Sequence, residues 1–195
     1  MTTSLVKGQK VDLTKASADS GNTLKKLSVA LGWSEKPTQT SGFDYDLDAS
    51  AFGLSSGKVF SQKHFVFFNN LASPEGAITH TGDNLTGAGE GDDETIVVDL
   101  DKVPDGIDKI VFAVTIYDAE NRKQNFGQVE NAFIRAYDDN STELVKYELD
   151  MEAALETVVV FGELVKRDGS WIFSANSAGF PGGFAGLCKQ YGVDV

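Results

Sequence analysis

Acidic residues and glycines are concentrated in one short stretch of the sequence, GDNLTGAGEGDDE at residues 82–94. The stretch holds five carboxylates and four glycines, and none of its residues is basic. Carboxylates this close together repel one another and raise each other's pKa in a folded loop. A calcium ion relieves that repulsion, because it binds about six to eight oxygens from carboxylates, Asn side chains, backbone carbonyls and water. The stretch is therefore a candidate calcium-binding loop.

Further clusters of oxygen ligands lie elsewhere in the chain, close to the ends of expected strands. They are Asp44, Asp46 and Asp48 in FDYDLDASAF, Asn69 and Asn70 in FFNNL, and Asp118 in TIYDAEN. The three aspartates alternate with apolar residues, so they share one face of a strand. Strand ends from distant parts of a sandwich can meet at one end of the fold. With only one Cys and two His in the chain, an oxygen-only site for a hard cation is expected there.

The acidic segments also match other kinds of site in part. Asp44, Asp46 and Asp48 match the first ligand positions of an EF-hand loop, but Ala49 replaces its required glycine and Ser55 its required glutamate. The glycines of GAGEGD suggest a phosphate cradle, yet the acidic neighbours repel phosphate and no lysine follows. A solvated acidic surface that docks a basic partner without metal stays open as the main alternative.

Residues that could support catalysis are few. GLSSG at 53–57 matches G-x-S-x-G, but it is followed by a strand-like KVF where a nucleophile elbow needs a helix, so a hairpin turn is expected. His64 is expected to pack within the fold. His80 either donates a hydrogen bond to a nearby carboxylate or is an exposed loop residue. We therefore expect a protein that is not an enzyme, with a metal-dependent enzyme as the weaker alternative.

Composition and charge limit the other possibilities. The 195-residue chain is 41% hydrophobic and carries a net charge of −12, which fits a folded domain that avoids nucleic acid and anionic lipid. The single cysteine, Cys188, excludes an internal disulfide framework and is expected to be a small buried side chain. There is no apolar secretory segment at the N-terminus and no run of ~18 apolar residues. A cytoplasmic location without membrane insertion is therefore expected.

Alternation of apolar and polar residues predicts strands along most of the chain. The two strands at 64–70 and 109–118 are apolar on both faces and are expected to be central. The predicted strands are 26–33, 43–52, 64–70, 95–101 and 109–118, with hairpins at 132–149 and 157–176.

Helical patterns are restricted to 151–156 and 183–191, and the segments 14–23 and 34–42 are expected to be surface loops. Many strands with turns at short spacing and little helix predict an all-β fold. The expected architecture is one domain, residues 1–195, forming an antiparallel β-sandwich with one or two short helices and the calcium sites at one acidic, loop-rich end.

The sequence also resembles the tellurium-resistance TerD/TerE family. The segments that carry the likeness are KGQKVDLTK, LGW, FDYDLDASAF, FFNNL, HTGDNLTGAGEGDDE, FAVTIYDAENRKQNFGQV and VFGEL…WIF. The resemblance runs from about residue 4 to the C-terminus and implies a β-sandwich that binds two calcium ions. It also implies a stress-response role linked to resistance to tellurite, colicins and phage.

Carried over by position, the resemblance implies calcium ligands among Asp44, Asp46, Asp48, Asn69, Asn70, Asp83, Asn84, Glu90, Asp92, Asp93, Glu94 and Asp118. Three aspartates at alternate positions of a strand span about 13 Å, so one ion cannot bind all of them without a bend or bulge. The implied role is a non-enzymatic, calcium-dependent adaptor that binds other proteins of a stress-response complex. The segment 14–26 is longer and more basic than is usual in the family, which concerns surface contacts rather than the metal site.

Overall fold

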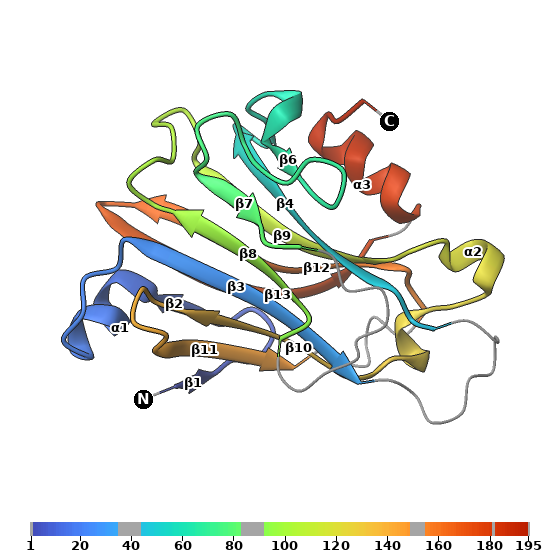
Figure 1. The fold of residues 1–195 in the computed structure, drawn as a ribbon, viewed down its shortest axis with the longest axis horizontal. Coiled ribbons are helices and arrows are strands. Elements are labelled where there is room, and N and C mark those ends of the chain that lie inside the picture. The colour runs from blue at the N-terminus through green and yellow to red at the C-terminus, as the bar shows by residue number, and fades with distance from the viewer. Residues whose placement is uncertain (1, 35–43, 83–91, 149–154, 181, 195) are drawn as a thin grey trace.

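The computed structural model describes residues 2–34, 44–82, 92–148, 155–180 and 182–194, and in these ranges it contains two β-sheets and three short α-helices (Figure 1). Sheet A has the strand order β1 (Thr3–Ser4), β11 (Glu143–Glu148), β10 (Glu130–Tyr137), β3 (Lys26–Ser34), β8 (Glu94–Asp99) and β7 (Ile78–His80).

Sheet B has the order β2 (Lys10–Asp12), β13 (Ser170–Gly179), β12 (Val158–Arg167), β9 (Lys109–Ile116), β4 (Leu47–Ser55) and β5 (Lys58–Val59), and β6 (Phe65–Val66) also pairs with β4. Among these described strands, the pairs are antiparallel except for the parallel pair β1–β11.

The main hydrophobic core lies between the two sheets. It contains Leu27 and Leu31 from β3 together with Phe112 from β9 and Phe161 from β12. The alternate residues of β3 point into this core because side chains in a strand alternate between its two faces. The apolar packing holds the ends of the strands in fixed positions, and those ends carry the acidic residues.

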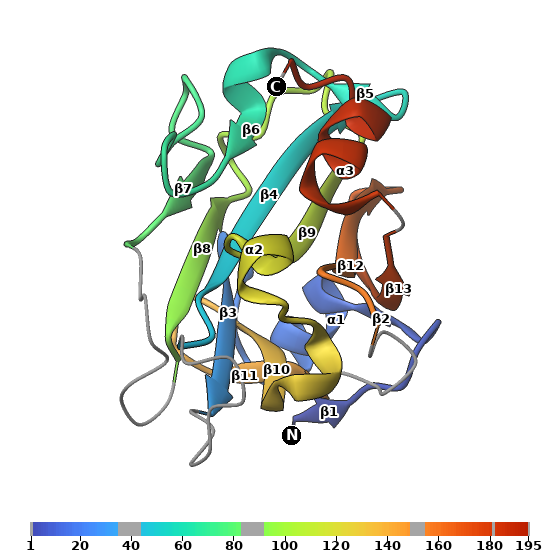
Figure 2. The same ribbon diagram turned by 90° about the vertical axis from the view of Figure 1, so that its right-hand side faces the viewer.

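The outer face of sheet B is also covered. Helix α3 (Gly183–Tyr191) lies against this face (Figure 2), where Leu187 and Cys188 pack in a second buried cluster with Phe52 of β4 and Val111 of β9. Strand β9 is therefore buried on both faces, as its doubly apolar sequence predicts.

Most of the sequence-based fold prediction is confirmed. Both hairpins form, as β10–β11 and β12–β13, and the second turns at Asp168 and Gly169 with φ of 51° and 82°. Positive φ at both central residues is typical of the two-residue turn that Asp-Gly favours. The helix predicted at 183–191 is α3, with identical bounds. No helix in the described ranges is long and apolar enough to cross a membrane.

Several predicted elements are wrong. The expected loop at 14–23 contains helix α1 (Leu13–Asp19), which Asp12 caps by accepting a hydrogen bond from the Lys15 N–H at 2.9 Å. The expected central strand at 64–70 is only the two-residue β6, because the chain turns back between Phe67 and Asn70. Phe65 and Phe67 pack in the cluster under α3, whereas Val66 lies in the core between the two sheets.

One strand boundary also differs from the prediction, and a second helix was not predicted. Strand β4 starts at Leu47 rather than at residue 43, and the short helix α2 (Ala119–Arg122) follows β9. The predicted helix at 151–156 and loop at 34–42 lie mostly outside the described residues.

Candidate functional site

Acidic side chains from several strands gather at one end of the sandwich, which we call the acidic end and define by Asp46, Asp48, Asp93, Glu94 and Asp118. Leu47 of β4 pairs with Ile116 of β9, and Leu31 of β3 pairs with Glu94 of β8. The starts of β4 and β8 therefore lie beside the ends of β9 and β3. These five residues from distant segments therefore lie at the same end of the sandwich, and whether they bind metal stays a prediction.

Asp46 and Asp48 lie on the outer face of sheet B, because the intervening Leu47 and the following Ala49 point into the core. Both residues are nonetheless only 7% exposed. Asp48 pairs with Thr115 across the β4–β9 ladder, and the Asp46 carbonyl accepts a hydrogen bond from the Tyr117 N–H at 2.9 Å. Strand pairing therefore fixes the positions of both aspartates at the junction with β9.

Asp118 follows β9 and has a left-handed backbone with φ of 51°. Its carboxylate accepts a hydrogen bond from the Asn121 side chain at 2.6 Å, which holds it over the first turn of α2. Asp48 and Asp118 line the same cavity, of about 230 Å³, together with the hydroxyl-bearing Ser50 and Thr115. Two candidate ligands from separate segments thus face one space.

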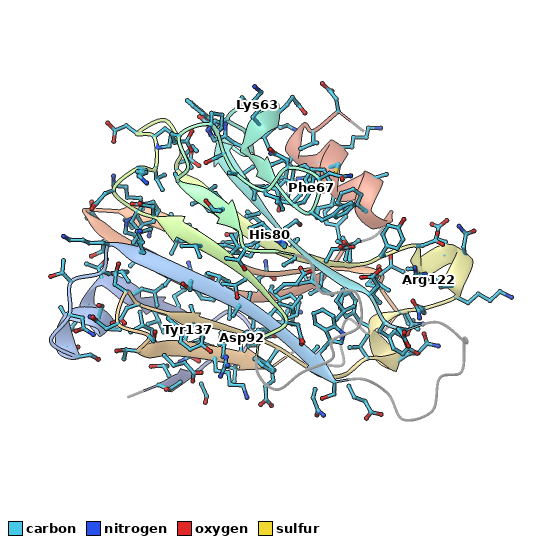
Figure 3. The ribbon with its side chains drawn as sticks, viewed as in Figure 1. Lys63, Phe67, His80, Asp92, Arg122 and Tyr137 are labelled. Carbon is cyan, nitrogen blue, oxygen red and sulfur yellow. The ribbon has the colours of Figure 1, made fainter. Side chains whose placement is uncertain are left out.

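Arg122 of α2 supplies a positive charge at this end of the molecule (Figure 3). One of its guanidinium nitrogens lies 3.7 Å from an Asp46 carboxylate oxygen, and the guanidinium stacks 5.1 Å from the centre of the Tyr117 ring. This contact is not predicted from the sequence. Its only signal in the sequence is an arginine four residues after Asp118.

Glu94 is directed between the two sheets. Its carboxylate accepts a hydrogen bond from the Ala49 N–H of β4 at 2.6 Å and lies 3.3 Å from Nε2 of His80. The Gly82 N–H donates to Nδ1 of His80, which leaves the ring proton on Nε2, facing Glu94. His80 is 3% exposed, so it is the buried partner of a carboxylate rather than an exposed loop residue.

Asp93 accepts a hydrogen bond from the Trp33 N–H at 2.9 Å at the end of β3. Burial raises the pKa of Asp93, and the charge of Asp92 adds to the increase, while the bond from Trp33 opposes it. The repulsion expected from the sequence therefore contributes to this pKa, although burial contributes more.

Asp92 is directed toward sheet A. Its carboxylate accepts from Nε of Arg135 at 2.6 Å and from the Tyr137 hydroxyl at 3.0 Å, and Figure 3 shows Asp92 beside Tyr137. The bond to Asp92 is the main cause that raises the pKa of Arg135. Asp92, Asp93 and Glu94 are consecutive, yet each binds a different part of the protein.

The remaining predicted ligands have separate surroundings. The Asp44 carbonyl accepts from the Gln124 side chain at 3.2 Å, and Asn69 is exposed. The side-chain amide of Asn70 donates to the Phe65 carbonyl at 2.6 Å. Asp83, Asn84 and Glu90 lie outside the described residues.

No group of three Asp, Glu, His or Cys side chains in the described ranges is close enough to hold a metal ion. A complete oxygen site at the acidic end therefore has to include other oxygens, such as hydroxyls, backbone carbonyls, water or the predicted ligands at 83–91.

The segments considered for catalysis have structural roles. GLSSG forms the β4–β5 hairpin, which turns at Ser56 and Gly57 with φ of 52° and 83°. The buried His64 ring contacts the Ser61 hydroxyl at 2.8 Å and the Glu75 carboxylate at 3.1 Å, and so links two neighbouring turns. Cys188 is fully buried, as expected.

Comparison with known proteins identifies the family. The family model described as the TerD domain matches residues 1–191. The chain is 50% identical to "Tellurium resistance protein TerD" of Serratia marcescens and 48% identical to "General stress protein 16U" of Bacillus subtilis (strain 168), each over 197 aligned positions and the full length of both chains.

The fold also matches a solved structure. The crystal structure of a homologue of telluride resistance protein (TerD) from Streptomyces coelicolor A3(2) superposes with a TM-score of 0.68, covering 85% of this chain and 95% of that one at 24% identity. This likeness concerns the fold alone. On the family match and the full-length identities, the chain belongs to the TerD family.

Proposed function

We propose that this protein binds calcium at the acidic end and acts as a non-enzymatic adaptor in a stress response. The single observation that carries the proposal is that Asp48, which is 7% exposed, and Asp118 line one cavity where β4 and β9 meet, with the equally buried Asp46 just before the start of β4. Carboxylates taken out of water are costly to keep ionised, and a divalent cation lowers that cost by direct coordination.

The chemistry of the available ligands fits calcium. The acidic end offers carboxylates from Asp46, Asp48 and Asp118 and hydroxyls from Ser50 and Thr115, all of them hard oxygens. The thiol of Cys188 lies in the separate cluster under α3. Asp83, Asn84 and Glu90 are further candidates for the same ions, and the family resemblance supports two ions.

Bound calcium would do two things here. It would neutralise carboxylates at an end of the molecule where Arg122 already lies 3.7 Å from Asp46. It would also join the start of β4 to the end of β9, and so fix the surface at this end of the molecule. A surface that depends on metal in this way is suited to calcium-dependent binding of another protein. The names of the relatives, tellurium resistance and general stress proteins, support a role in stress tolerance for this chain.

The proposal is tested by calorimetric titration of calcium into chelator-stripped protein with magnesium in the buffer. We expect binding with a Kd on the order of micromolar or tighter and a whole-number stoichiometry. Asp48→Asn should weaken it at least tenfold. Asp105→Asn, which removes the same charge from an exposed turn before β9, is the matched control and should bind as the wild type does.

The result that rejects calcium binding is the absence of heat, or equal affinity in Asp48→Asn and the wild type. The acidic end would then be a metal-independent docking surface. Such a surface would bind a basic partner in the presence of chelator and lose affinity steeply as salt is added.

A further inference from the structure

The cavity at the acidic end has aromatic walls as well as carboxylates. Besides Asp48 and Asp118, it is lined by the rings of Phe67, Phe68 and Tyr117. Phe184 from α3 also lines it. Its volume of about 230 Å³ is below the roughly 300 Å³ at which cavities for drug-sized ligands begin. The cavity therefore suits a small chemical group rather than a large molecule.

The planes of neighbouring rings that line the cavity are nearly perpendicular. The planes of Phe67 and Phe68 are 78° apart, and those of Phe68 and Tyr117 are 85° apart. Ring faces carry the negative side of the aromatic quadrupole, so an aromatic-lined cavity of this kind can bind an organic ammonium group where a ring face borders it. Carboxylates in the same space add the opposite charge, and Asp48 is more than nine-tenths buried there.

The protein already uses this chemistry beside the cavity. The guanidinium of Arg122 stacks on the Tyr117 ring at 5.1 Å and lies 3.7 Å from the Asp46 carboxylate. An organic cation is therefore stabilised here by one aromatic face and one carboxylate. The cavity adds the rings of Phe67 and Phe68 and the carboxylates of Asp48 and Asp118 as groups with which a cation from solvent can interact.

We propose that this cavity, lined by Asp48, Asp118, Phe67, Phe68 and Tyr117, binds an alkylammonium group. The cation would lie among the rings with its charge toward the two carboxylates. Ser50 and Thr115 supply hydroxyl oxygens that can accept hydrogen bonds from a primary ammonium. A primary ammonium on an alkyl chain occurs both in free polyamines and in the lysine side chains of a partner protein.

The inference does not rest on calcium binding. Calcium and an ammonium ion compete for Asp48 and Asp118, so the measurement uses protein with calcium removed by chelator. Failure to bind calcium in the calorimetric titration leaves the ammonium site unaffected. Failure to bind an ammonium ion likewise leaves the calcium proposal standing.

The test is a residue-resolved NMR titration with n-butylammonium, which is the lysine side chain without its backbone, and with neutral 1-butanol as the comparator. We expect saturating shifts at Phe68, Thr115 and Tyr117, with a Kd on the order of millimolar. 1-Butanol should bind at least tenfold more weakly. Spermidine and a short lysine peptide are compared next, and the tighter of the two identifies the source of the amine.

Three variants locate the site. Tyr117→Leu keeps an apolar side chain at a position that is 47% exposed but removes the ring, and it should weaken n-butylammonium binding roughly threefold to tenfold. Asp118→Asn, also at an exposed position, should weaken it by a similar factor. Asp105→Asn is the control for overall charge and should leave the affinity unchanged. Preserved NMR dispersion shows that each variant is folded.

The proposal is overturned if 1-butanol binds as tightly as n-butylammonium, or if the shifts spread over the acidic surface without saturation. Equal affinity in folded Tyr117→Leu and wild type would also overturn it. Weakening in Tyr117→Leu and Asp118→Asn, with none in Asp105→Asn, would establish the site.

Discussion

The carboxylate of Glu94 in sheet A accepts a hydrogen bond at 2.6 Å from the backbone N–H of Ala49 in sheet B. On the side of β4 away from β9, β6 pairs only with Ala51 and Phe52. A buried backbone N–H beyond that point needs another acceptor, because leaving it unpaired is costly. Glu94 therefore takes the place of a partner strand and joins the two sheets at the acidic end.

Removing this acceptor should destabilise the fold. We expect Glu94→Ala to lower the free energy of unfolding by about 1–3 kcal/mol, the usual cost of leaving a buried donor unsatisfied. Glu94→Gln keeps an acceptor oxygen and should lose less. Urea denaturation of calcium-free protein measures both. The exposed Glu148→Ala is the control, and a Glu94→Ala loss no larger than its own would contradict this role.

Calcium should raise the melting temperature if the proposed site exists. A ligand at a hundredfold excess over its Kd adds about 2.7 kcal/mol per site to the stability of the folded state. Thermal unfolding with calcium and with EDTA should therefore differ by several degrees in the wild type and in Asp105→Asn. Asp48→Asn should show a much smaller difference. Identical melting curves for wild-type protein with and without calcium would argue against the site.

Substitution of Asp92 tests whether a carboxylate that already pairs with Arg135 also takes part in calcium binding. Asp92 bonds to Arg135 and Tyr137, and the side chains of Asp92 and Arg135 are about a quarter exposed, so Asp92→Asn should cost roughly 0.5–1 kcal/mol of stability. We expect calcium affinity to stay within about twofold of the wild type. A tenfold loss would instead show that calcium draws Asp92 away from Arg135.

Asp138 should make stability depend on acid pH. Burial favours its neutral form, but hydrogen bonds from the Thr142 and Asn140 backbones and from the Asn22 side chain outweigh burial and lower its pKa. The folded-state pKa lies below the unfolded value of 3.8, so this contribution is complete above that value. It is lost as the pH falls through the folded-state pKa.

The matched variant is Asp138→Asn, which cannot ionise. It should be less stable than the wild type at neutral pH, and the difference between the two should shrink as the pH is lowered below about 4. Urea denaturation at a series of pH values measures this. A difference that stays constant across the series would show that the carboxylate charge is not responsible.

Cys188 should be unreactive in the folded protein. Burial raises the pKa of its thiol to about 11, so little thiolate is present near pH 8, and the side chain is fully covered. Ellman's reagent should react with one thiol per chain in denaturant and only very slowly in native buffer. Rapid reaction in native buffer would mean that α3 detaches readily from sheet B.

Local sequence signals predicted much of the fold. The Asp168–Gly169 hairpin turn was found because its φ angles are encoded by two adjacent residues. Helix α1 was missed because only Leu13 and Ser17 are buried on it, so its sequence shows little helical periodicity. The segment 64–70 was wrongly predicted as one continuous strand because its apolar run does not reveal the turn between Phe67 and Asn70. Its apolar side chains are divided between the cluster under α3 and the core between the sheets, and no local pattern contains that information.

The residue types of the candidate site were predicted better than the contacts that each side chain makes. The alternation with apolar residues correctly placed Asp48 on the face of a strand opposite Leu47 and Ala49, whereas Asp46 lies just before that strand begins. Asp92, Asp93 and Glu94 share one charge pattern, but successive residues of a chain entering a strand point in different directions. Their partners, Arg135, Trp33 and Ala49, come from three other strands, and only the assembled sandwich determines those contacts.

Trp33 contacts both acidic segments, so its fluorescence can report on how they are arranged. Its backbone N–H binds the Asp93 carboxylate, and its indole N–H donates to the Tyr45 carbonyl at 3.1 Å, next to Asp46. Indole emission responds to the polarity and charge of its surroundings, so movement of either segment should change the fluorescence of Trp33. With Trp171→Phe removing the other indole, this single fluorophore would report, without an added label, when the acidic end rearranges around a cation.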